Sequence, residues 1–237
     1  MVNARRSLVL SLCGLPLLAC APLELMEGNL VTIPANAERI YALTLGIGGP
    51  DLEMLEWSNR PPGQRVPGPF PLPKPDRLQL GSGFPRDLAK PILTFDRPMP
   101  TDGPLYEAYN LGFIWAVNEA LKTTLDTIDP TAFDYVRGET GFPDGSRGPD
   151  YWLLEVVRFV DCYDVAGSVA VNPLFVSEHG TADFAGDGHV FRLSALGDAS
   201  FFRIPQSSEW LCTERAKLRV KADGHQRVHF VEVGWAV

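Results

Sequence analysis

A proline-dense stretch in the N-terminal half limits what this chain can fold into. Residues 60–77 read RPPGQRVPGPFPLPKPDR, and seven of these residues are proline. Proline has no backbone N–H and a fixed φ angle, so this segment joins neither a helix nor the interior of a sheet. We therefore expect an extended, solvent-facing arm. A ligand for a domain that binds polyproline helices is the alternative interpretation.

The first 20 residues, MVNARRSLVLSLCGLPLLAC, are typical of a bacterial export signal. A basic start is followed by an apolar stretch of about a dozen residues, too short for a permanent membrane span of roughly 20 residues. The last four residues resemble a lipobox, in which the cysteine is acylated. Residues 1–19 are thus a candidate lipoprotein signal peptide, and Cys20 is the candidate lipid attachment site.

This interpretation predicts a lipoprotein of the cell envelope that faces the periplasm, with membrane contact only through the lipid on Cys20. A buried apolar element at the N-terminus, or translation from Met26, is the alternative, and it predicts a cytoplasmic protein.

Two segments have the residue spacing of amphipathic helices. Between residues 105 and 129 apolar side chains recur at intervals of three and four, which places them on one helical face, and Pro130 ends the pattern. Residues 207–219 form the second candidate, with Ser207 or Ser208 as its N-cap and Leu211, Arg215 and Leu218 on one side.

Other segments show strand patterns. The strongest is Tyr151–Asp164, YWLLEVVRFVDCYD, which is rich in β-branched and aromatic residues and indicates a central strand. Residues 51–57 are expected to form one helical turn. The remaining predicted strands or extended runs are residues 38–49, 133–139, 189–193, 200–204 and 227–235.

This order of elements predicts an α+β fold. We expect a single domain at residues 105–237, with a mostly antiparallel sheet and two packed amphipathic helices. Residues 20–104 would precede it as an N-terminal strand and the proline-rich arm.

The charge balance restricts the partners of the chain. Lys and Arg total 21 against 29 Asp and Glu, a formal net charge of −8. Such a surface repels a phosphate backbone, which disfavours nucleic-acid binding, and it attracts a basic protein.

No catalytic or metal-binding constellation emerges from the sequence. A glycine-x-serine-x-glycine nucleophile motif is absent, and His225 and His229 are four apart across a turn and a strand, where they cannot share a metal. Cys162 and Cys212 have no basic neighbour that would activate a thiol. We therefore expect no catalytic residues, no metal and no cofactor.

The C-terminal half carries a recognisable series of motifs. A Tyr-Trp-Leu-Leu strand, an arginine and an Asp-x-x-Asp pair precede a Phe-Arg-Leu segment, a short hydrophobic strand, an amphipathic helix and a final strand. The residues concerned are Tyr151, Trp152, Arg158, Asp161, Asp164, Phe191 and Arg192. Over residues 105–237 this pattern resembles immunity protein family eleven of bacterial polymorphic toxin systems.

The resemblance implies a binding protein that neutralises a cognate bacterial toxin, and not an enzyme. We expect the interface to use acids of the 177–188 loop, namely Glu178, Asp183 and Asp187, or exposed aromatic side chains, and the net charge favours a basic toxin.

Two other functions remain open. An envelope lipoprotein with a structural or carrier role would explain Cys20 and the proline-rich arm without a toxin. A hydrolase would need Asp161 and Asp164 as its acids, but residues three apart on a strand face opposite sides. For these two acids, hydrogen bonding at a strand end or an ion pair with Arg158 is the structural alternative.

Overall fold

The computed structural model describes residues 35–45, 55–61, 83–98, 105–111, 114–171, 184 and 188–237. All of them belong to one compact unit, residues 32–237. Three of the predicted features lie outside the described residues: the N-terminal segment with Cys20, most of the proline-rich stretch, and the acids Glu178, Asp183 and Asp187.

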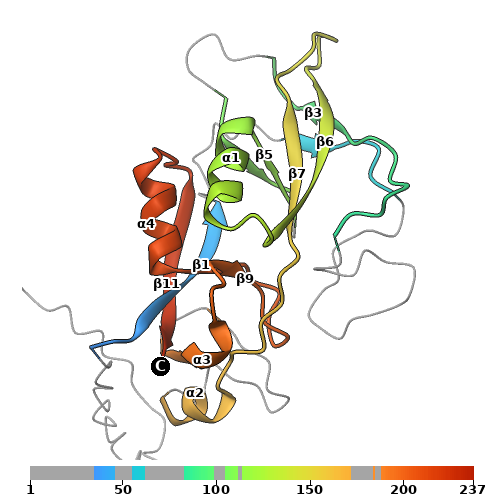
Figure 1. Cartoon of the computed structure of the whole chain (residues 1–237). Helices are drawn as coiled ribbons and strands as arrows, with labels where there is room; N and C mark the ends of the chain where they lie inside the picture. Colours follow the sequence, from blue (N-terminus) through green and yellow to red (C-terminus); the bar gives the residue numbers. More distant parts are fainter. Residues whose placement is uncertain are drawn as a thin grey trace, which may run out of the picture. The chain divides into compact units, whose positions relative to one another are not determined.

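The described residues form two sheets (Figure 1). The five-stranded sheet has the order β8-β11-β1-β10-β9, with bounds His189–Phe191, Val228–Ala236, Glu38–Leu45, Leu211–Thr213 and Phe201–Phe202. The six-stranded sheet has the order β2-β3-β6-β7-β5-β4, with bounds Leu55–Trp57, Ile92–Phe95, Phe133–Gly141, Tyr151–Val156, Trp115–Val117 and Ala108–Asn110. The helices are α1 (Glu119–Ile128), α2 (Val165–Val171), α3 (Leu193–Leu196) and α4 (Glu214–Ala222).

The α+β class is confirmed, whereas the prediction of one mostly antiparallel sheet is wrong. There are two sheets, and both are mixed: β8 pairs with β11 in parallel, and β3 pairs with β6 in parallel. Alternation along a segment indicates a strand but does not indicate its partner, because pairing depends on contacts far apart in the sequence.

The predicted helix between residues 105 and 129 is correct only in its second half. Asn118 is the N-cap of α1, and its side chain accepts a hydrogen bond from Leu121 N–H at 2.9 Å. Before Asn118 the chain instead forms β4 and β5, and Trp115 of β5 pairs with Leu154 of β7. A tertiary partner thus overrides the local helical pattern.

The second predicted helix begins later than Ser207. Leu211–Thr213 forms β10 between β1 and β9, and Thr213 caps α4 by accepting a hydrogen bond from Ala216 N–H at 3.3 Å. Leu211 is buried in this strand, whereas Arg215 and Leu218 are exposed on the helix, so the three do not share one face.

Several strand predictions are confirmed by β1, β6, β8, β9 and β11. The strand predicted over Tyr151–Asp164 ends at Val156, and residues 157–164 continue as irregular chain with isolated bridges from Phe159 and Tyr163. The helical turn expected at residues 51–57 is wrong, since Leu55–Trp57 is strand β2, paired with β3.

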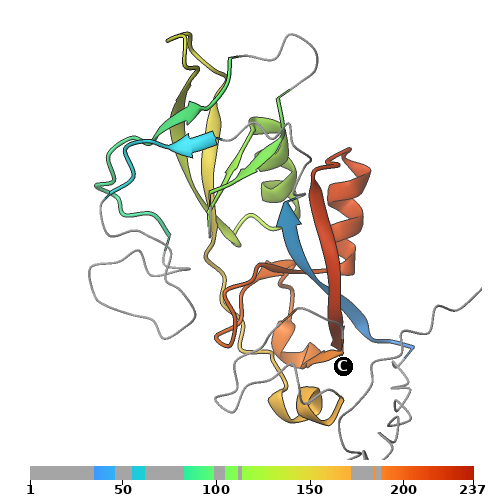
Figure 2. The same ribbon diagram turned by 180° about the vertical axis from the view of Figure 1, so that it is seen from behind.

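The two longer helices lie side by side on the same side of the molecule (Figures 1 and 2). Thr124 of α1 donates a hydrogen bond to Asp223 at the end of α4 at 3.2 Å, and its hydroxyl lies 2.9 Å from Nε2 of His225. One core cluster joins α1, α4 and residues of both sheets, including Leu121, Val220 and Leu154. Among the described residues, no helix is long and apolar enough to cross a membrane.

Candidate functional site

The six-stranded sheet extends beyond the helix that covers it. Tyr135 of β6 and Leu154 of β7 pair opposite each other and pack in the core beside α1. Two residues further along, Arg137 and Trp152 also pair opposite each other. Helix α1 begins beside this pair and does not cover the sheet beyond it. Because side chains two apart on a strand share a face, this exposed area continues the covered face.

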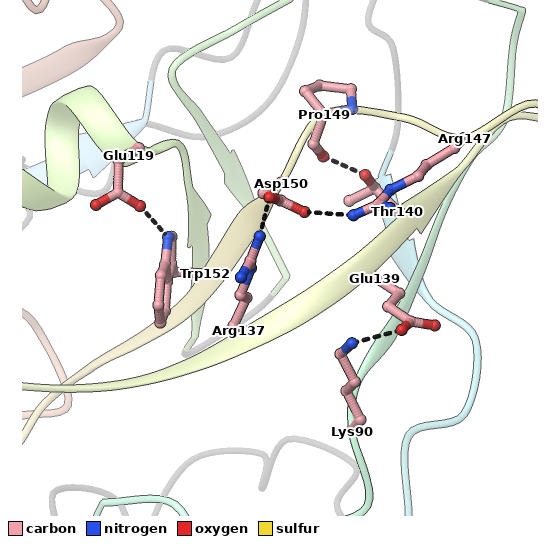
Figure 3. A network of polar contacts seen from close by, with 9 residues as sticks. All are labelled: Lys90, Glu119, Arg137, Glu139, Thr140, Arg147, Pro149, Asp150 and Trp152. Atoms are coloured by element: carbon pink, nitrogen blue, oxygen red, sulfur yellow. Dashed lines mark hydrogen bonds and ion pairs between the residues drawn. The ribbon is translucent and has the colours of Figure 1, made fainter.

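We call this area the Trp152 surface. It comprises Lys90, Ile92, Glu119, Arg137, Glu139, Arg147, Asp150 and Trp152, most of which are drawn in Figure 3.

The indole of Trp152 is held from several sides. Its Nε1–H donates a hydrogen bond to Glu119 Oε2 at 2.6 Å, which ties the ring to the first turn of α1 (Figure 3). Lys122 Nζ lies 5.1 Å and Arg137 Cζ lies 6.0 Å from the ring centroid, both within reach of the π face. A partly exposed aromatic side chain is thereby fixed in one orientation.

The charges around Trp152 are paired with one another. Asp150 accepts hydrogen bonds from Arg137 and from Arg147, the second at 3.3 Å, and Glu139 pairs with Lys90. The hydrogen bond from Arg137 is the main cause that lowers the pKa of Asp150, and the one from Lys90 lowers the pKa of Glu139. Both carboxylates are therefore ionised at neutral pH, so the charges of the Trp152 surface do not change with pH in this range.

This arrangement suits protein recognition. Trp, Tyr and Arg are the residue types most enriched at the energetically important positions of interfaces, and a side chain already fixed in place loses little freedom on binding. Ile92, which pairs opposite Glu139 and is 47% exposed, adds apolar area beside the charges.

The described residues show little that favours a metal site or a reactive cysteine. No group of three or more His, Cys, Asp or Glu among them is placed to hold a metal ion. Burial raises the pKa of the Cys162 thiol to about 12 and the pKa of Cys212 well above its ordinary value, so neither is a thiolate at neutral pH.

Arg158, one of the predicted motif residues, has a structural position. Its Nη2 lies 3.1 Å from Oδ1 of Asp129, a buried carboxylate at the end of α1. Oδ2 of Asp129 accepts hydrogen bonds from the backbone N–H groups of Ser200 at 3.0 Å and Phe201 at 3.3 Å. Asp129 thus ties the end of α1 both to Arg158, after β7, and to the segment that enters β9.

Four other motif residues, Asp161, Asp164, Phe191 and Arg192, lie in or against the irregular segment that follows β7, whereas Tyr151 is the first residue of β7. Arg192 donates a hydrogen bond to the backbone oxygen of Asp161 at 2.6 Å, and its guanidinium also lies 3.6 Å from the carboxylate. Asp164 accepts a hydrogen bond from Gly167 N–H at 3.0 Å, the contact of a helix N-cap, at the start of α2. Tyr151 and Phe191 are fully buried.

The predicted loop acids, Glu178, Asp183 and Asp187, lie outside the described residues. Their role in binding stays a prediction. Phe184, which is described, is buried against His189 and Tyr163, with ring centroids 4.5 and 6.4 Å away.

Sequence reasoning named Trp152 but missed the charged side chains beside it. The signal was present in β6, where Tyr135, Arg137 and Glu139 alternate and must share one face. Glu119 gave no such signal, because it reaches Trp152 only through the fold.

A protein family model matches most of the chain. The family model described as Immunity protein family (Imm11) matches residues 51–234, more than three quarters of the chain. No curated protein matches it.

Proposed function

Because the chain belongs to the Imm11 family of immunity proteins, we propose that it binds and inhibits one cognate bacterial toxin. The family match over residues 51–234 is the observation that carries this proposal. The Trp152 surface supports it, since a fixed aromatic ring inside a ring of paired charges is a protein-binding arrangement.

The test of inhibition is co-expression. Immunity genes usually lie beside the gene of their toxin, so the neighbouring toxin domain is expressed in a sensitive host with and without this chain. Survival only in the presence of this chain, together with co-purification of the two proteins, is the expected result. Death of the host despite abundant soluble chain would overturn the proposal.

We propose further that the toxin docks on the Trp152 surface. Trp152→Ala removes the aromatic ring, and we expect it to weaken the complex by about 2 kcal/mol or more, as central interface tryptophans do. Trp152→Phe keeps a ring in place and is expected to retain part of the affinity.

Phe159→Ala is the matched control, because Phe159 is also an exposed aromatic residue, at 47%, but lies outside the Trp152 surface. Isothermal titration calorimetry of each variant with the purified toxin domain measures the effect. Equal losses for Trp152→Ala and Phe159→Ala would exclude this docking site.

The N-terminal segment supports a proposal about location. We propose that residues 1–19 direct export and that Cys20 carries the lipid, so that the protein meets its toxin at the periplasmic side of the envelope. Intact mass and cell fractionation, compared between the wild type and Cys20→Ser, test this. A soluble, unprocessed wild-type protein would show that the inhibitor is cytoplasmic.

A further inference from the structure

Helix α4 presents a cationic face on an acidic protein. Its nine residues, ERAKLRVKA, contain four cations and one acid, whereas the whole chain has a net charge of −8. Arg215, Leu218, Arg219 and Ala222 are all exposed and follow the spacing that places residues on one helical face. We call these four residues the α4 surface.

Arg215 has no evident role in holding the fold together. It forms no hydrogen bond or ion pair with the described residues, and it lies in the first turn of α4. The N-terminus of a helix carries the positive end of its dipole, so a cation there is unfavourable for the helix. Neither a polar contact nor the helix dipole therefore accounts for an arginine at this position.

Leu218 is also exposed without a structural reason. Its exposed fraction of 60% is the highest among the large apolar side chains of the described residues. It lies one turn after Arg215 and next to Arg219, so an apolar side chain is flanked by two guanidinium groups. Such a combination suits a partner that offers carboxylates around an apolar spot.

The other cations of α4 are held against the sheet and border the α4 surface. Lys217 Nζ lies 3.7 Å from the ring centroid of Tyr41, and Lys221 donates a hydrogen bond to the backbone oxygen of Val228 at 2.7 Å. Their charges add to the positive field of the helix while their positions stay fixed. Of the cations on the exposed face, Arg219 is paired with Asp223 at 3.2 Å, which leaves Arg215 as the free charge.

We infer that α4 contacts an acidic patch of the cognate toxin through Arg215, Leu218 and Arg219. This inference rests on the proposed function and specifies the chemistry of the partner. It differs from the expectation of a basic toxin, which followed from net charge alone, because an interface depends on the local charge of the contacting surface. Nucleic acid is the less favoured occupant, since the rest of the chain repels a phosphate backbone.

The inference is tested with Arg215→Glu and the purified toxin domain encoded beside this gene. Glutamate in the first turn is favourable for the helix dipole, so this variant is expected to fold at least as well as the wild type. Arg86→Glu is the matched control, because Arg86 is an exposed arginine in a turn before β3, outside the α4 surface, and its reversal changes the net charge equally.

We expect Arg215→Glu to raise the Kd of the complex about tenfold, and Arg86→Glu to change it less than about threefold. The difference between the wild type and Arg215→Glu should shrink as NaCl rises from about 50 to about 300 mM, because salt screens exposed charges. Leu218→Gln, which leaves the charge unchanged, is expected to weaken the complex at both salt concentrations.

Other outcomes overturn the inference in distinct ways. Tighter binding by Arg215→Glu would mean that the toxin presents a basic patch, and an effect equal to that of Arg86→Glu would mean that α4 is outside the interface. Binding of a 20-base-pair duplex by the wild type, lost in Arg215→Glu, would assign the α4 surface to nucleic acid. Failure of the wild type to bind the toxin domain at all would instead overturn the proposed function.

Discussion

The guanidinium of Arg203 lies 4.0 Å from a carboxylate oxygen of Glu155, and both side chains are almost completely buried. Glu155 belongs to β7 of the six-stranded sheet, whereas Arg203 directly follows β9 of the five-stranded sheet. The pair therefore joins the two sheets through the interior. The ring of Trp210, 5.6 Å from the guanidinium carbon, provides a further favourable neighbour.

Removing one member of this pair should be costly. Burial lowers the pKa of Arg203 to about 10, so its side chain stays charged at neutral pH. Glu155→Gln removes the stronger of the two carboxylate charges that stabilise this buried cation, the other being that of Glu209. We expect the free energy of unfolding to fall by about 3 kcal/mol, the lower end of the cost of breaking a buried ion pair. Urea denaturation at pH 7 measures this.

Asp198→Asn is the control for the buried pair. Asp198 forms its ion pair with Arg158 at 3.6 Å while 99% exposed, so its loss is expected to cost less than about 1 kcal/mol. Similar losses in both variants would contradict the role assigned to burial.

Gly234 allows the close approach of the two strands that make the parallel pair of the five-stranded sheet. A Cβ at this position would lie 1.8 Å from the backbone oxygen of His189, its partner in β8. Gly234→Ala must therefore push β8 away from β11, and we expect a loss of about 1–3 kcal/mol in the free energy of unfolding. Thermal denaturation gives the comparison.

Gly141→Ala serves as the matched substitution for Gly234→Ala. Gly141 is likewise near the end of a long strand, but a Cβ there would meet its nearest neighbour, the backbone oxygen of Ser146, at an ordinary 3.7 Å. Equal stability of Gly234→Ala and Gly141→Ala would contradict this prediction, because it would mean that β8 and β11 move apart without a loss of free energy.

The local parts of this fold are readable from the sequence, and the distant pairings are not. Alternation placed β6 and β11, because half-buried strands expose every second residue. The helical spacing around Trp115 is misleading, because this segment forms strand β5 and pairs with β7. The parallel pairing of β3 with β6 and of β8 with β11 has no local sign in the sequence, because pairing is a property of the assembled sheets.

The candidate site shows the same division. Trp152 was named from its motif, and Arg137 is recoverable from the alternation of β6. Glu119, in contrast, contacts Trp152 from 33 residues away in the sequence, and only the packing of α1 on the sheet brings the two together. Arg158 was named as a motif residue, but its contact with the buried Asp129 ties it to the fold.

The two buried cysteines, Cys162 and Cys212, should be unreactive towards thiol reagents in the folded protein. Burial raises the pKa of Cys162 to about 12 and that of Cys212 well above 9.0, so the thiolate fraction of each at pH 8 is very small. We expect iodoacetamide to leave both unmodified in buffer and to modify both in about 6 M guanidinium chloride, where burial is lost. Peptide mass spectrometry identifies the labelled positions, and rapid labelling of either residue in buffer would contradict this burial.

The ion pairs of the Trp152 surface predict a specific pH dependence. The hydrogen bond from Arg137 is the main cause that lowers the pKa of Asp150 below its ordinary 3.8. A carboxyl whose pKa is lower in the folded than in the unfolded chain stabilises the folded state above the unfolded pKa, and this contribution is lost as the pH falls through the folded pKa. The stability difference between the wild type and Arg137→Gln should therefore be constant near neutral pH and shrink in acid.

Carbon-detected NMR titration of Asp150 measures the cause directly. In Arg137→Gln we expect the pKa of Asp150 to rise toward 3.8, with Arg147, 3.3 Å away, still lowering it in part. Asp144 is the internal control, because its lowered pKa comes from hydrogen bonds with Ser146 and should not respond to Arg137. An unchanged pKa for Asp150 would mean that Arg137 does not hold this carboxylate, and the Trp152 surface would then lack the fixed charge pattern on which its docking role depends.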